Sequence, residues 1–357
     1  MEAIVIIAGG RGERFWPKSR AGKPKQFTDL TGKGSMLFLT YQRVAKMVDP
    51  ERIFVVTGQE YREITRQNLP DLPEQNIIVE PEGRNTAPCI GLTAVILEHR
   101  FPGATMVVVP ADHLIKEDDL FVNTLKRAVE LAGKTGGLVT LGIRPTRPET
   151  GYGYLRTGEE VPLGQGETAY KVSSFVEKPD VQKAERFLSE GGYLWNAGIF
   201  IWQVPVILGA FKTHLPDIYE GLLKIGSSLG TPEYTQVLTG VYPSLQKISV
   251  DFGIMEKVDQ VYTVPGEFSW DDVGSWRALE RVFGTDTNGN VLLGNILALD
   301  STNCIIETCG RMVAAIGLED LVVVETEDIT FICPKDKTDR VRELLASLSS
   351  QNMEKYL

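Results

Sequence analysis

The sequence predicts an α/β protein with a mostly parallel central sheet, followed by a small β-rich C-terminal domain that ends in a helix. Two observations lead to this fold class. Short runs of Val and Ile alternate with helical patterns over residues 2–143, and from about residue 285 short β-like runs broken by turn residues replace that alternation. A length of 357 residues suits one large and one smaller domain. We expect them over residues 1–284 and 285–357.

Five apolar runs are expected to form the first strands of the sheet. They do not alternate between polar and apolar residues, which is typical of strands buried on both faces. The runs are AIVIIAG (3–9), RIFVVTG (52–58), NIIVEP (76–81), TMVVVPADH (105–113) and GLVTLGI (137–143). Strand, helix and strand at this spacing form right-handed βαβ units, so the sheet should be parallel.

Helical patterns separate these runs, and Pro88 suits a first helical turn. They are SMLFLTYQRVAKMV (35–48), TAPCIGLTAVILEHR (86–100) and DLFVNTLKRAVELAG (119–133). After Arg144 the strand-like pieces TGYGYLRT, AYKVSSFVEKP and LWNAGIFIWQV predict an extension of the same sheet, followed by helices around residues 204–229. The amphipathic segment DKTDRVRELLASL (336–348) predicts the last helix.

The composition is that of an ordinary soluble protein, with 43% hydrophobic and 24% charged residues and a net charge of -10. This acidic balance argues against a nucleic-acid or membrane partner. The sequence has neither an apolar run of membrane-spanning length nor an N-terminal signal peptide, so we expect a cytoplasmic protein.

The cysteines and histidines do not form a catalytic or metal-binding pattern. The four cysteines contain no C-x-x-C pair, which argues against a zinc site and a disulfide framework, and we expect buried thiols at Cys89, Cys304, Cys309 and Cys333. The three histidines are scattered at positions 99, 113 and 214. A histidine-based triad or metal cluster is therefore not expected.

The segment AGGRGERFWPKSRAGKPKQF (8–27) follows the first strand and is rich in glycine and basic residues. It lacks the G-x-x-x-x-G-K-[ST] of a P-loop, and Phe15 stands where a dinucleotide fingerprint needs its third glycine. A third kind of loop wraps a nucleoside triphosphate with backbone N–H groups. A solvated basic turn is the alternative, but the loop follows the carboxyl edge of a parallel strand, where such folds bind ligands.

Charge matching supports the phosphate interpretation. A nucleoside triphosphate and a second phosphorylated substrate together carry about six negative charges. Six basic residues follow the strand, at Arg11, Arg14, Lys18, Arg20, Lys23 and Lys25.

This loop resembles the signature of sugar nucleotidyltransferases, above all of the mannose-1-phosphate guanylyltransferases, also called GDP-mannose pyrophosphorylases. Further strings carry the resemblance to about residue 283, in family order: GRNTAP (83–88), PADH (110–113), FVEKP (175–179), WNAGIF (195–200) and FSWDDVGSW (268–276). It implies a Rossmann-like domain, a smaller β-rich domain and a homodimer. The loop departs from the family at Glu13, where Thr or Ser is common, at Phe15 and at Lys18. We expect the Glu13 carboxylate to turn away from the triphosphate.

The resemblance implies transfer of GMP from GTP to α-D-mannose 1-phosphate, with GDP-mannose and pyrophosphate as products. The attacking phosphate is already ionised, so positioning and charge neutralisation replace a general base. Arg14 and Lys25 would hold the triphosphate, and Lys178 would orient the attacking phosphate. The nucleotide-binding positions that the resemblance implies are Ala8, Gly9, Gly10, Gly12, Glu80, Gly83, Asn85, Thr86 and Pro88. A nucleotidyltransferase for another hexose 1-phosphate or nucleotide, and a non-catalytic sugar-nucleotide sensor, are the alternatives.

The sugar-phosphate site implied by the resemblance comprises Gly153, Tyr154, Glu177, Lys178 and Asn196. The Asn196 amide can both donate and accept hydrogen bonds to neighbouring hydroxyls. Pro179 should end the strand, so that Glu177 and Lys178 need not point to opposite faces. An exposed charged turn is the alternative for this pair.

Two aspartates are expected to hold Mg²⁺. Asp112 follows an apolar strand, and Asp272 lies in WDDVGSW next to Asp271. Carboxylates from distant parts of the chain plus phosphate oxygens form the oxygen site that Mg²⁺ prefers. The resemblance matches Asp112 and Asp272 to the metal-binding aspartates, and a helix N-cap is the alternative for Asp272.

The C-terminal β segment contains no chemical motif, and we expect it to pack on the catalytic domain or on a partner subunit. Some relatives carry a fused phosphomannose isomerase. The end of this chain and its few histidines predict a monofunctional protein.

Overall fold

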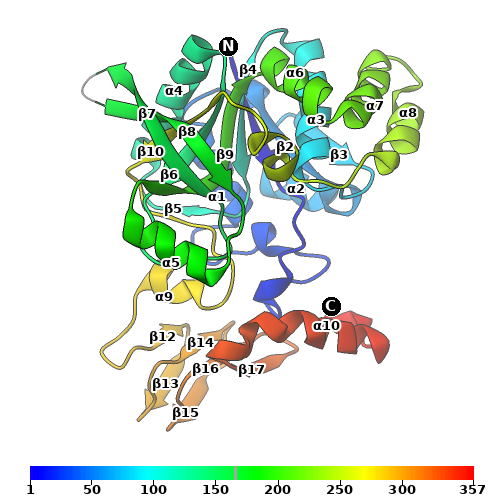
Figure 1. Ribbon diagram of the computed structural model, residues 1–357. Helices are drawn as coiled ribbons and strands as arrows, with labels where there is room; N and C mark the ends of the chain where they lie inside the picture. Colours follow the sequence, from blue (N-terminus) through cyan, green and yellow to red (C-terminus); the bar gives the residue numbers. More distant parts are fainter. Residues whose placement is uncertain (165–166) are drawn as a thin grey trace. The chain divides into compact units, whose positions relative to one another are not determined.

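The computed structural model describes residues 1–164 and 167–357, and the chain forms two compact units (Figure 1). The first unit comprises Met1–Gly9, Thr40–Ala111 and Ile115–Trp270. The second comprises Gly10–Leu39, Asp112–Leu114 and Asp271–Leu357. The basic loop therefore belongs to the same unit as the C-terminal region, although most of the first unit separates them in sequence.

The first unit is built on a nine-stranded sheet of order β3-β2-β1-β4-β9-β6-β10-β8-β7. Its strands are β1 (Glu2–Ile7), β2 (Ile53–Gly58), β3 (Ile77–Glu80), β4 (Thr105–Pro110), β6 (Leu138–Ile143), β7 (Tyr154–Gly164), β8 (Glu167–Val176), β9 (Tyr193–Gln203) and β10 (Val261–Gly266). All run in one direction except β8 and β9. The predicted mostly parallel sheet, its first five strands and its extension after Arg144 are confirmed.

Alternate residues of β1 show why these strands lack a polar face. Ala3 and Val5 lie in the same apolar cluster as α3 (Thr86–Arg100), while Ile4 and Ile6 point to the opposite face and are equally buried. The carboxyl ends of β1, β2, β3 and β4 share one edge of the sheet, because these strands are parallel. Ala8, Gly9 and Glu80 lie at this edge.

The helices of the first unit pack on this sheet and on one another. They are α2 (Arg62–Asn68), α3 (Thr86–Arg100), α4 (Asp118–Thr135), α5 (Val181–Glu190), α6 (Val204–His214), α7 (Pro216–Ser227) and α8 (Tyr234–Val241). Figure 1 shows α6, α7 and α8 grouped beside α3, and α3 contacts both α6 and α7. Helix α3 begins at Thr86, so Pro88 occupies its first turn as predicted.

The second unit consists of the basic loop and a set of short β-strands, together with two helices. Its elements are β12 (Val291–Leu293), β13 (Ile296–Leu299), β14 (Ile305–Thr308), β15 (Val313–Ile316), β16 (Leu321–Glu325), β17 (Thr330–Pro334), α9 (Ala278–Phe283) and α10 (Val341–Ser350). Strands β12, β14 and β16 are parallel, as are β13 and β15. Helix α10 lies along these strands (Figure 1), and Val341 shares one core with Phe15, Trp16 and Phe331. The small β-rich C-terminal domain is confirmed.

Three elements include a boundary between the units: α1 (Met36–Val44), β5 (Leu114–Ile115) and β11 (Trp270–Asp271). Helix α1 is shorter than the predicted 35–48, because the Lys46 N–H donates to the Arg43 carbonyl and the backbone tightens into turns. Helix α10 starts later than predicted, since residues 335–340 form a 3₁₀ helix.

Two further expectations concern the burial of the cysteines and the presence of a membrane-spanning helix. Cys89 and Cys304 are buried thiols, but Cys309 is exposed, and Cys333 is partly exposed, so the prediction was wrong for these two. Both belong to strand ends of the small β region, where one side chain in two faces outward. Among the helices of the described residues, none has the length and apolar character needed to cross a bilayer.

Candidate active site

The basic loop of the second unit folds tightly around Lys25. Gly12 has φ +62, and a Cβ at this position would lie 2.5 Å from Lys25 Cβ and 2.6 Å from Lys25 N. Only glycine fits this approach and this left-handed backbone. The Ser19 hydroxyl donates to the Gly12 carbonyl at 2.6 Å, and Gln26 Nε2 donates to the Gly10 carbonyl at 2.8 Å. The loop is therefore held by its own side chains.

Lys25 is a buried cation whose position is fixed by oxygens from two distant segments. Its side chain is 6% exposed. Its Nζ lies 2.9 Å from Asp112 Oδ2 and donates to the Asp272 backbone carbonyl at 2.5 Å. The structure thus brings together three of the residues predicted from sequence, Lys25, Asp112 and Asp272, within one unit.

The turn around Asp272 has an unusual backbone. Val273 is buried and has φ +47, which is rare for a β-branched residue and points to a functional constraint. Asp271 Oδ1 accepts from the Val273 N–H at 2.8 Å, and Asp272 Oδ1 accepts from the Gly274 N–H at 3.1 Å. Asp272 is not a helix N-cap, because α9 begins at Ala278 with Arg277 at its cap.

Asp271 plays a different part from its neighbour. Its two carboxylate oxygens accept from Arg281, at 2.6 Å from Nε and 3.1 Å from Nη2. This pairing ties the turn to α9. The Asp272 carboxylate, in contrast, faces the pocket described next.

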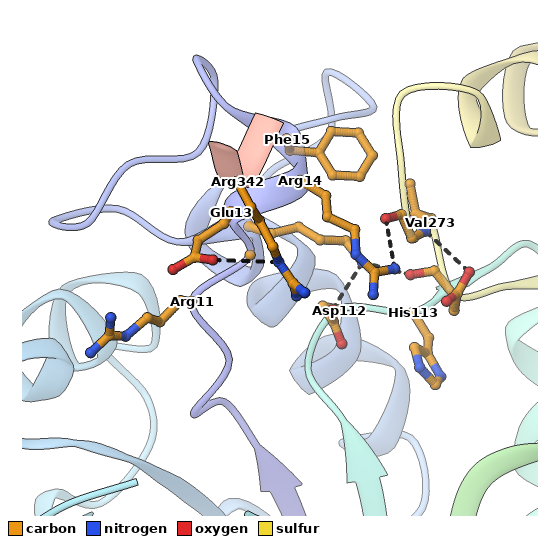
Figure 2. Close-up of a pocket in the computed structure, with 12 residues that line it drawn as sticks. Arg11, Glu13, Arg14, Phe15, Asp112, His113, Val273 and Arg342 are labelled. Carbon is orange, nitrogen blue, oxygen red and sulfur yellow. Dashed lines mark hydrogen bonds and ion pairs between the residues drawn. The ribbon is translucent and has the colours of Figure 1, made fainter. Parts of the chain in front are cut away.

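A pocket of about 410 Å³ in the second unit collects the loop cations and these carboxylates (Figure 2). It is lined by Arg11, Gly12, Glu13, Arg14, Phe15, Lys25, Asp112, His113, Asp272, Val273, Gly274 and Arg342. Arg14 reaches across it to the Gly274 carbonyl at 3.4 Å, whereas Arg11 points away from the other cations. Among the described residues, neither arginine has a carboxylate within ion-pair distance, so both can bind an anion.

Two of the six basic residues counted in the sequence form ion pairs with carboxylates outside the pocket. Lys18 forms a salt bridge with Glu307, and Arg20 Nη2 lies 2.6 Å from Asp328 Oδ1. Both partners lie on or beside the small strands of the second unit. These two cations bind the loop to its own unit, so matching all six to phosphates was wrong.

The Lys25 ammonium keeps Asp112 ionised. Desolvation acts to raise the pKa of Asp112, but the positive charges of Lys25 and His113 bring that pKa below its ordinary value. Desolvation lowers the pKa of His113 despite the nearby aspartates. At neutral pH the pocket therefore contains an aspartate anion beside the Lys25 ammonium.

The expected base-binding residues lie in the first unit, at the end of β3 and the start of α3. Glu80 is buried and accepts a hydrogen bond from the Tyr242 hydroxyl. A Cβ on Gly9 would lie 3.3 Å from Glu80 Oε2, so this carboxylate borders the loop beginning at Ala8 and Gly9. Burial raises the pKa of Glu80 to about 7.

The rest of this group forms the N-terminus of α3. Asn85 has φ +66, and its Oδ1 accepts from the Thr86 N–H at 2.8 Å. The Thr86 hydroxyl accepts a hydrogen bond from the Val250 N–H, and Pro88 is buried in the first turn. Gly83 is open, with no atom within 4 Å of an added Cβ. Of the predicted nucleotide-binding glycines, Gly10 and Gly12 belong to the second unit and are described with the pocket above.

The expected sugar-binding residues also lie in the first unit, and four of them lie close together in space. A Cβ on Gly153 would lie 2.5 Å from Glu177 Oε2 and 3.3 Å from Asn196 Cβ. Strand β8 ends at Val176, and Lys178, with φ +47, turns back so that its Nζ lies 2.5 Å from Glu177 Oε1. The lysine side chain is 59% exposed, and the glutamate is buried. Tyr154 is different, because its side chain lies fully in the core against Phe187.

The comparisons with known proteins agree with this geometry. Residues 3–289 match the family described as nucleotidyl transferase, and residues 294–348 match a MannoseP isomerase/GMP-like beta-helix domain. The chain belongs to the nucleotidyl transferase family. This confirms the resemblance drawn from the loop and identifies the chain as an enzyme of this class.

Several relatives of this nucleotidyl transferase are similar along nearly its whole length. The alginate biosynthesis protein AlgA of Pseudomonas syringae pv. tomato is 39% identical, covering 97% of this chain and 72% of AlgA. The mannose-1-phosphate guanylyltransferase of Salmonella montevideo is 35% identical, covering 99% of this chain and 75% of that protein. A solved structure described as mannose-1-phosphate geranyltransferase from Thermus thermophilus has a TM-score of 0.88 and 36% identity, covering 98% and 99% of the two chains.

Two residues of this nucleotidyl transferase that contribute to the sites were missed from the sequence. Asp251 Oδ1 accepts from Asn196 Nδ2 at 3.0 Å, and desolvation together with the Glu177 charge raises its pKa to about 7. Arg342 lines the second-unit pocket. Asp251 stands in a turn-like string, SVDFGIME, that could have been noticed as polar residues amid apolar ones. Arg342 lies in an amphipathic helix and gives no such signal.

Nucleotidyl transferases generally use a divalent metal ion, and the second-unit pocket fits one. Asp112 and Asp272 offer carboxylate oxygens, the ligands that Mg²⁺ prefers. Over the described residues, no cluster of three or more His, Cys, Asp or Glu could hold a metal alone. Mg²⁺ commonly binds one or two carboxylates and completes its shell with substrate phosphates and water.

Proposed function

We propose that this nucleotidyl transferase transfers GMP from GTP to α-D-mannose 1-phosphate, giving GDP-mannose and pyrophosphate. The similarity to the Salmonella guanylyltransferase over 99% of this chain supports the choice of substrates. The observation that carries the chemistry is the buried Lys25 ammonium, fixed between Asp112 and Asp272 at the wall of a cationic pocket.

The proposed reaction is an in-line attack of a mannose 1-phosphate oxygen on the α-phosphorus of GTP. The P–O bond to the β-phosphate breaks, and pyrophosphate leaves with its electron pair. The nucleophile carries its negative charge already near neutral pH, so no residue has to remove a proton. Lys25 and Arg14 stabilise the charge on the triphosphate and the leaving group, and backbone N–H groups of Gly9 to Gly12 orient it.

We propose Asp112 and Asp272 as the residues that hold Mg²⁺. The ion would supply positive charge to the phosphate oxygens. Lys25, held beside Asp112, would supply a further positive charge to a phosphate oxygen. Mg²⁺ dependence is thus part of the proposal.

The proposed sugar and base sites use hydrogen bonds more than charge. Glu177 and Asn196 would bind mannose hydroxyls, with Gly153 and the backbone of Tyr154 against the ring and Lys178 on the sugar phosphate. Glu80 and the N-terminus of α3 from Gly83 to Pro88 would read guanine. A carboxylate can accept from both N1–H and N2–H₂ of guanine.

The test is pyrophosphate release with GTP, ATP, UTP and dTTP, each with mannose 1-phosphate and glucose 1-phosphate, with Mg²⁺ and with EDTA. We expect turnover with GTP and mannose 1-phosphate only, and none in EDTA. Turnover with another pair would assign a different nucleotidyltransferase activity. Tight GDP-mannose binding without turnover by any pair would instead support a sugar-nucleotide sensor.

The proposal also covers the domain boundary, the oligomeric state and the cellular location of the protein. We propose a catalytic domain over residues 1–284 and a C-terminal domain over 285–357; the family matches that end at 289 and begin at 294 support this boundary. We propose a cytoplasmic homodimer, since nucleoside triphosphates are cytoplasmic substrates. Light scattering coupled to size exclusion should give twice the chain mass of 39.5 kDa.

A further inference from the structure

The second-unit pocket contains a cation that does not come from the basic loop. Arg342, the second residue of α10, lines it with Arg11, Arg14 and Lys25. Its Nε lies 3.7 Å from Glu13 Oε2, and Figure 2 shows the two side chains facing each other. The preceding residue, Val341, is buried in the core that includes Phe15. The start of α10 is therefore anchored beside the loop.

We infer that Arg342 is a further polyphosphate-binding residue and that Glu13 pairs with it, in competition with phosphate, in the nucleotide-free enzyme. The inference rests on the proposed function, which places a triphosphate in this pocket. It assigns the C-terminal helix a direct part in the catalytic site. It also gives Glu13 a role, although an acid in a phosphate loop at first appears unfavourable.

The charges of the pocket support this assignment. Lys25 is already paired with Asp112 at 2.9 Å and is buried, so its ion pair is tightly held. The Arg342–Glu13 pair is longer and open to solvent, with side chains 65% and 37% exposed. An exposed pair of this kind is weak. Arg342 can therefore exchange its partner at little cost.

The chemistry of the two partners favours that exchange. A guanidinium forms paired hydrogen bonds with phosphate oxygens, which carry more charge than one carboxylate. When a polyphosphate enters, Arg342 turns to it, and like-charge repulsion drives Glu13 away. This movement agrees with the expectation that Glu13 does not contact the triphosphate.

The experiment measures magnesium pyrophosphate binding by isothermal titration calorimetry, with KM and kcat for GTP as second readouts. Arg342→Ala should weaken pyrophosphate binding roughly tenfold, the loss of one charge-assisted contact. It should raise KM for GTP more than it lowers kcat. Arg342→Lys should restore part of the affinity.

Arg340→Ala is the matched control, because Arg340 precedes the same helix, is similarly exposed and pairs with Glu343 at 2.8 Å. It removes the same charge and should change pyrophosphate affinity less than about twofold. Glu13→Gln should tighten binding, and this gain should disappear in the Glu13→Gln/Arg342→Ala double variant. Equal losses for the Arg340 and Arg342 variants, or weaker binding by Glu13→Gln, would overturn the inference.

Pyrophosphate as the probe separates this inference from the proposed function. It contains neither base nor sugar, so the affinities report on Arg342 even if the enzyme uses another nucleotide or hexose. Thermal unfolding of each variant identifies one that has lost its fold, and Arg342→Lys then provides the test.

Discussion

The carboxyl groups described in the two units of the molecule differ in the direction of their pKa shifts. In the second unit, Asp112 lies beside the buried Lys25 ammonium, and its pKa is below the ordinary value. In the first unit, burial raises the pKa values of Glu80 and Asp251 to about 7. The second-unit pocket keeps a full charge pair, whereas Glu80 and Asp251 of the first unit are partly protonated near neutral pH.

The two lysines of the proposed mechanism follow the same division. Lys25 is 6% exposed and fixed by oxygens from two other segments of the second unit, while Lys178 is 59% exposed on a turn after β8. Fixed charge suits a triphosphate, since preorganised cations stabilise charge without reorganising. Hydrogen-bonding groups of low net charge suit a neutral sugar and a base. The difference agrees with the proposal that the second-unit pocket binds the triphosphate and that first-unit residues bind the sugar and the base.

The largest expected effect comes from removing the fixed charge. Lys25→Ala should lower kcat/KM on the order of 10³-fold, because a preorganised cation is lost and Asp112 remains unpaired. Pyrophosphate release measures this, and circular dichroism checks the fold. Lys178→Ala should instead act mainly on the KM for the sugar phosphate. Equal and small losses for both variants would remove the contrast between the two lysines.

The second effect concerns the backbone that packs on Lys25. Gly12→Ala places a Cβ 2.5 Å from Lys25 Cβ at φ +62, and should destabilise the protein by roughly 2–5 kcal/mol. Gly10→Ala is the control, since nothing lies within 4 Å of its Cβ, and its cost should stay below about 1 kcal/mol. Thermal unfolding measures both. Similar melting temperatures for the two variants would show that the loop does not need the close approach.

Much of this organisation could be predicted from the sequence, and the limits have physical causes. The Val- and Ile-rich runs gave the strands correctly, and α3 matches its predicted bounds because Asn85 caps it and Pro88 suits its first turn. Strings such as FVEKP and WDDVGSW identified residues that the fold does cluster. Sequence order, however, does not show that Gly10–Leu39 joins the C-terminal region in one unit.

Long-range ion pairs were the least predictable part of the candidate site. All six loop cations were matched to phosphates, yet Lys18 and Arg20 pair with carboxylates about 300 positions away in the chain. Such pairing depends on tertiary packing and has no signature in residue spacing. Arg342 could not be predicted for the same reason. Its neighbour Val341 contributes to the helical pattern, whereas an arginine at this position is typical of a solvent-exposed helix face.

The third prediction uses the acids of the first unit. A carboxyl whose pKa is raised on folding stabilises the native state at pH values below its unfolded pKa, and this contribution is lost as pH rises through its folded pKa. For Asp251 the pKa rises from 3.8 to about 7, so stability should fall between about pH 4 and pH 7. Asp251→Asn should flatten this fall, by at most about 4 kcal/mol.

Melting temperatures from pH 4 to pH 8 test this, with Asp259→Asn as control, because Asp259 is exposed. The asparagine retains an oxygen that can accept from Asn196 Nδ2. A wild-type profile that Asp251→Asn leaves unchanged would show that this acid is ionised in the folded protein. The contrast between the units would then rest on Glu80 alone.

The smallest expected effect tests whether the loop cations share one role. Arg20 lies 2.6 Å from Asp328, which is half exposed, and also donates to the Pro17 carbonyl at 2.6 Å. Arg20→Ala should change the KM for GTP by less than about twofold. It should cost about 1–3 kcal/mol of stability, because the partly buried guanidinium loses charge-assisted hydrogen bonds. Steady-state kinetics beside Lys25→Ala make the comparison direct. If Arg20→Ala raised the KM for GTP tenfold, the whole basic run would act on phosphate, and the division between binding and structural cations would fail. A small effect means that burial between oxygens, rather than membership of the loop, distinguishes the cation that works on the triphosphate.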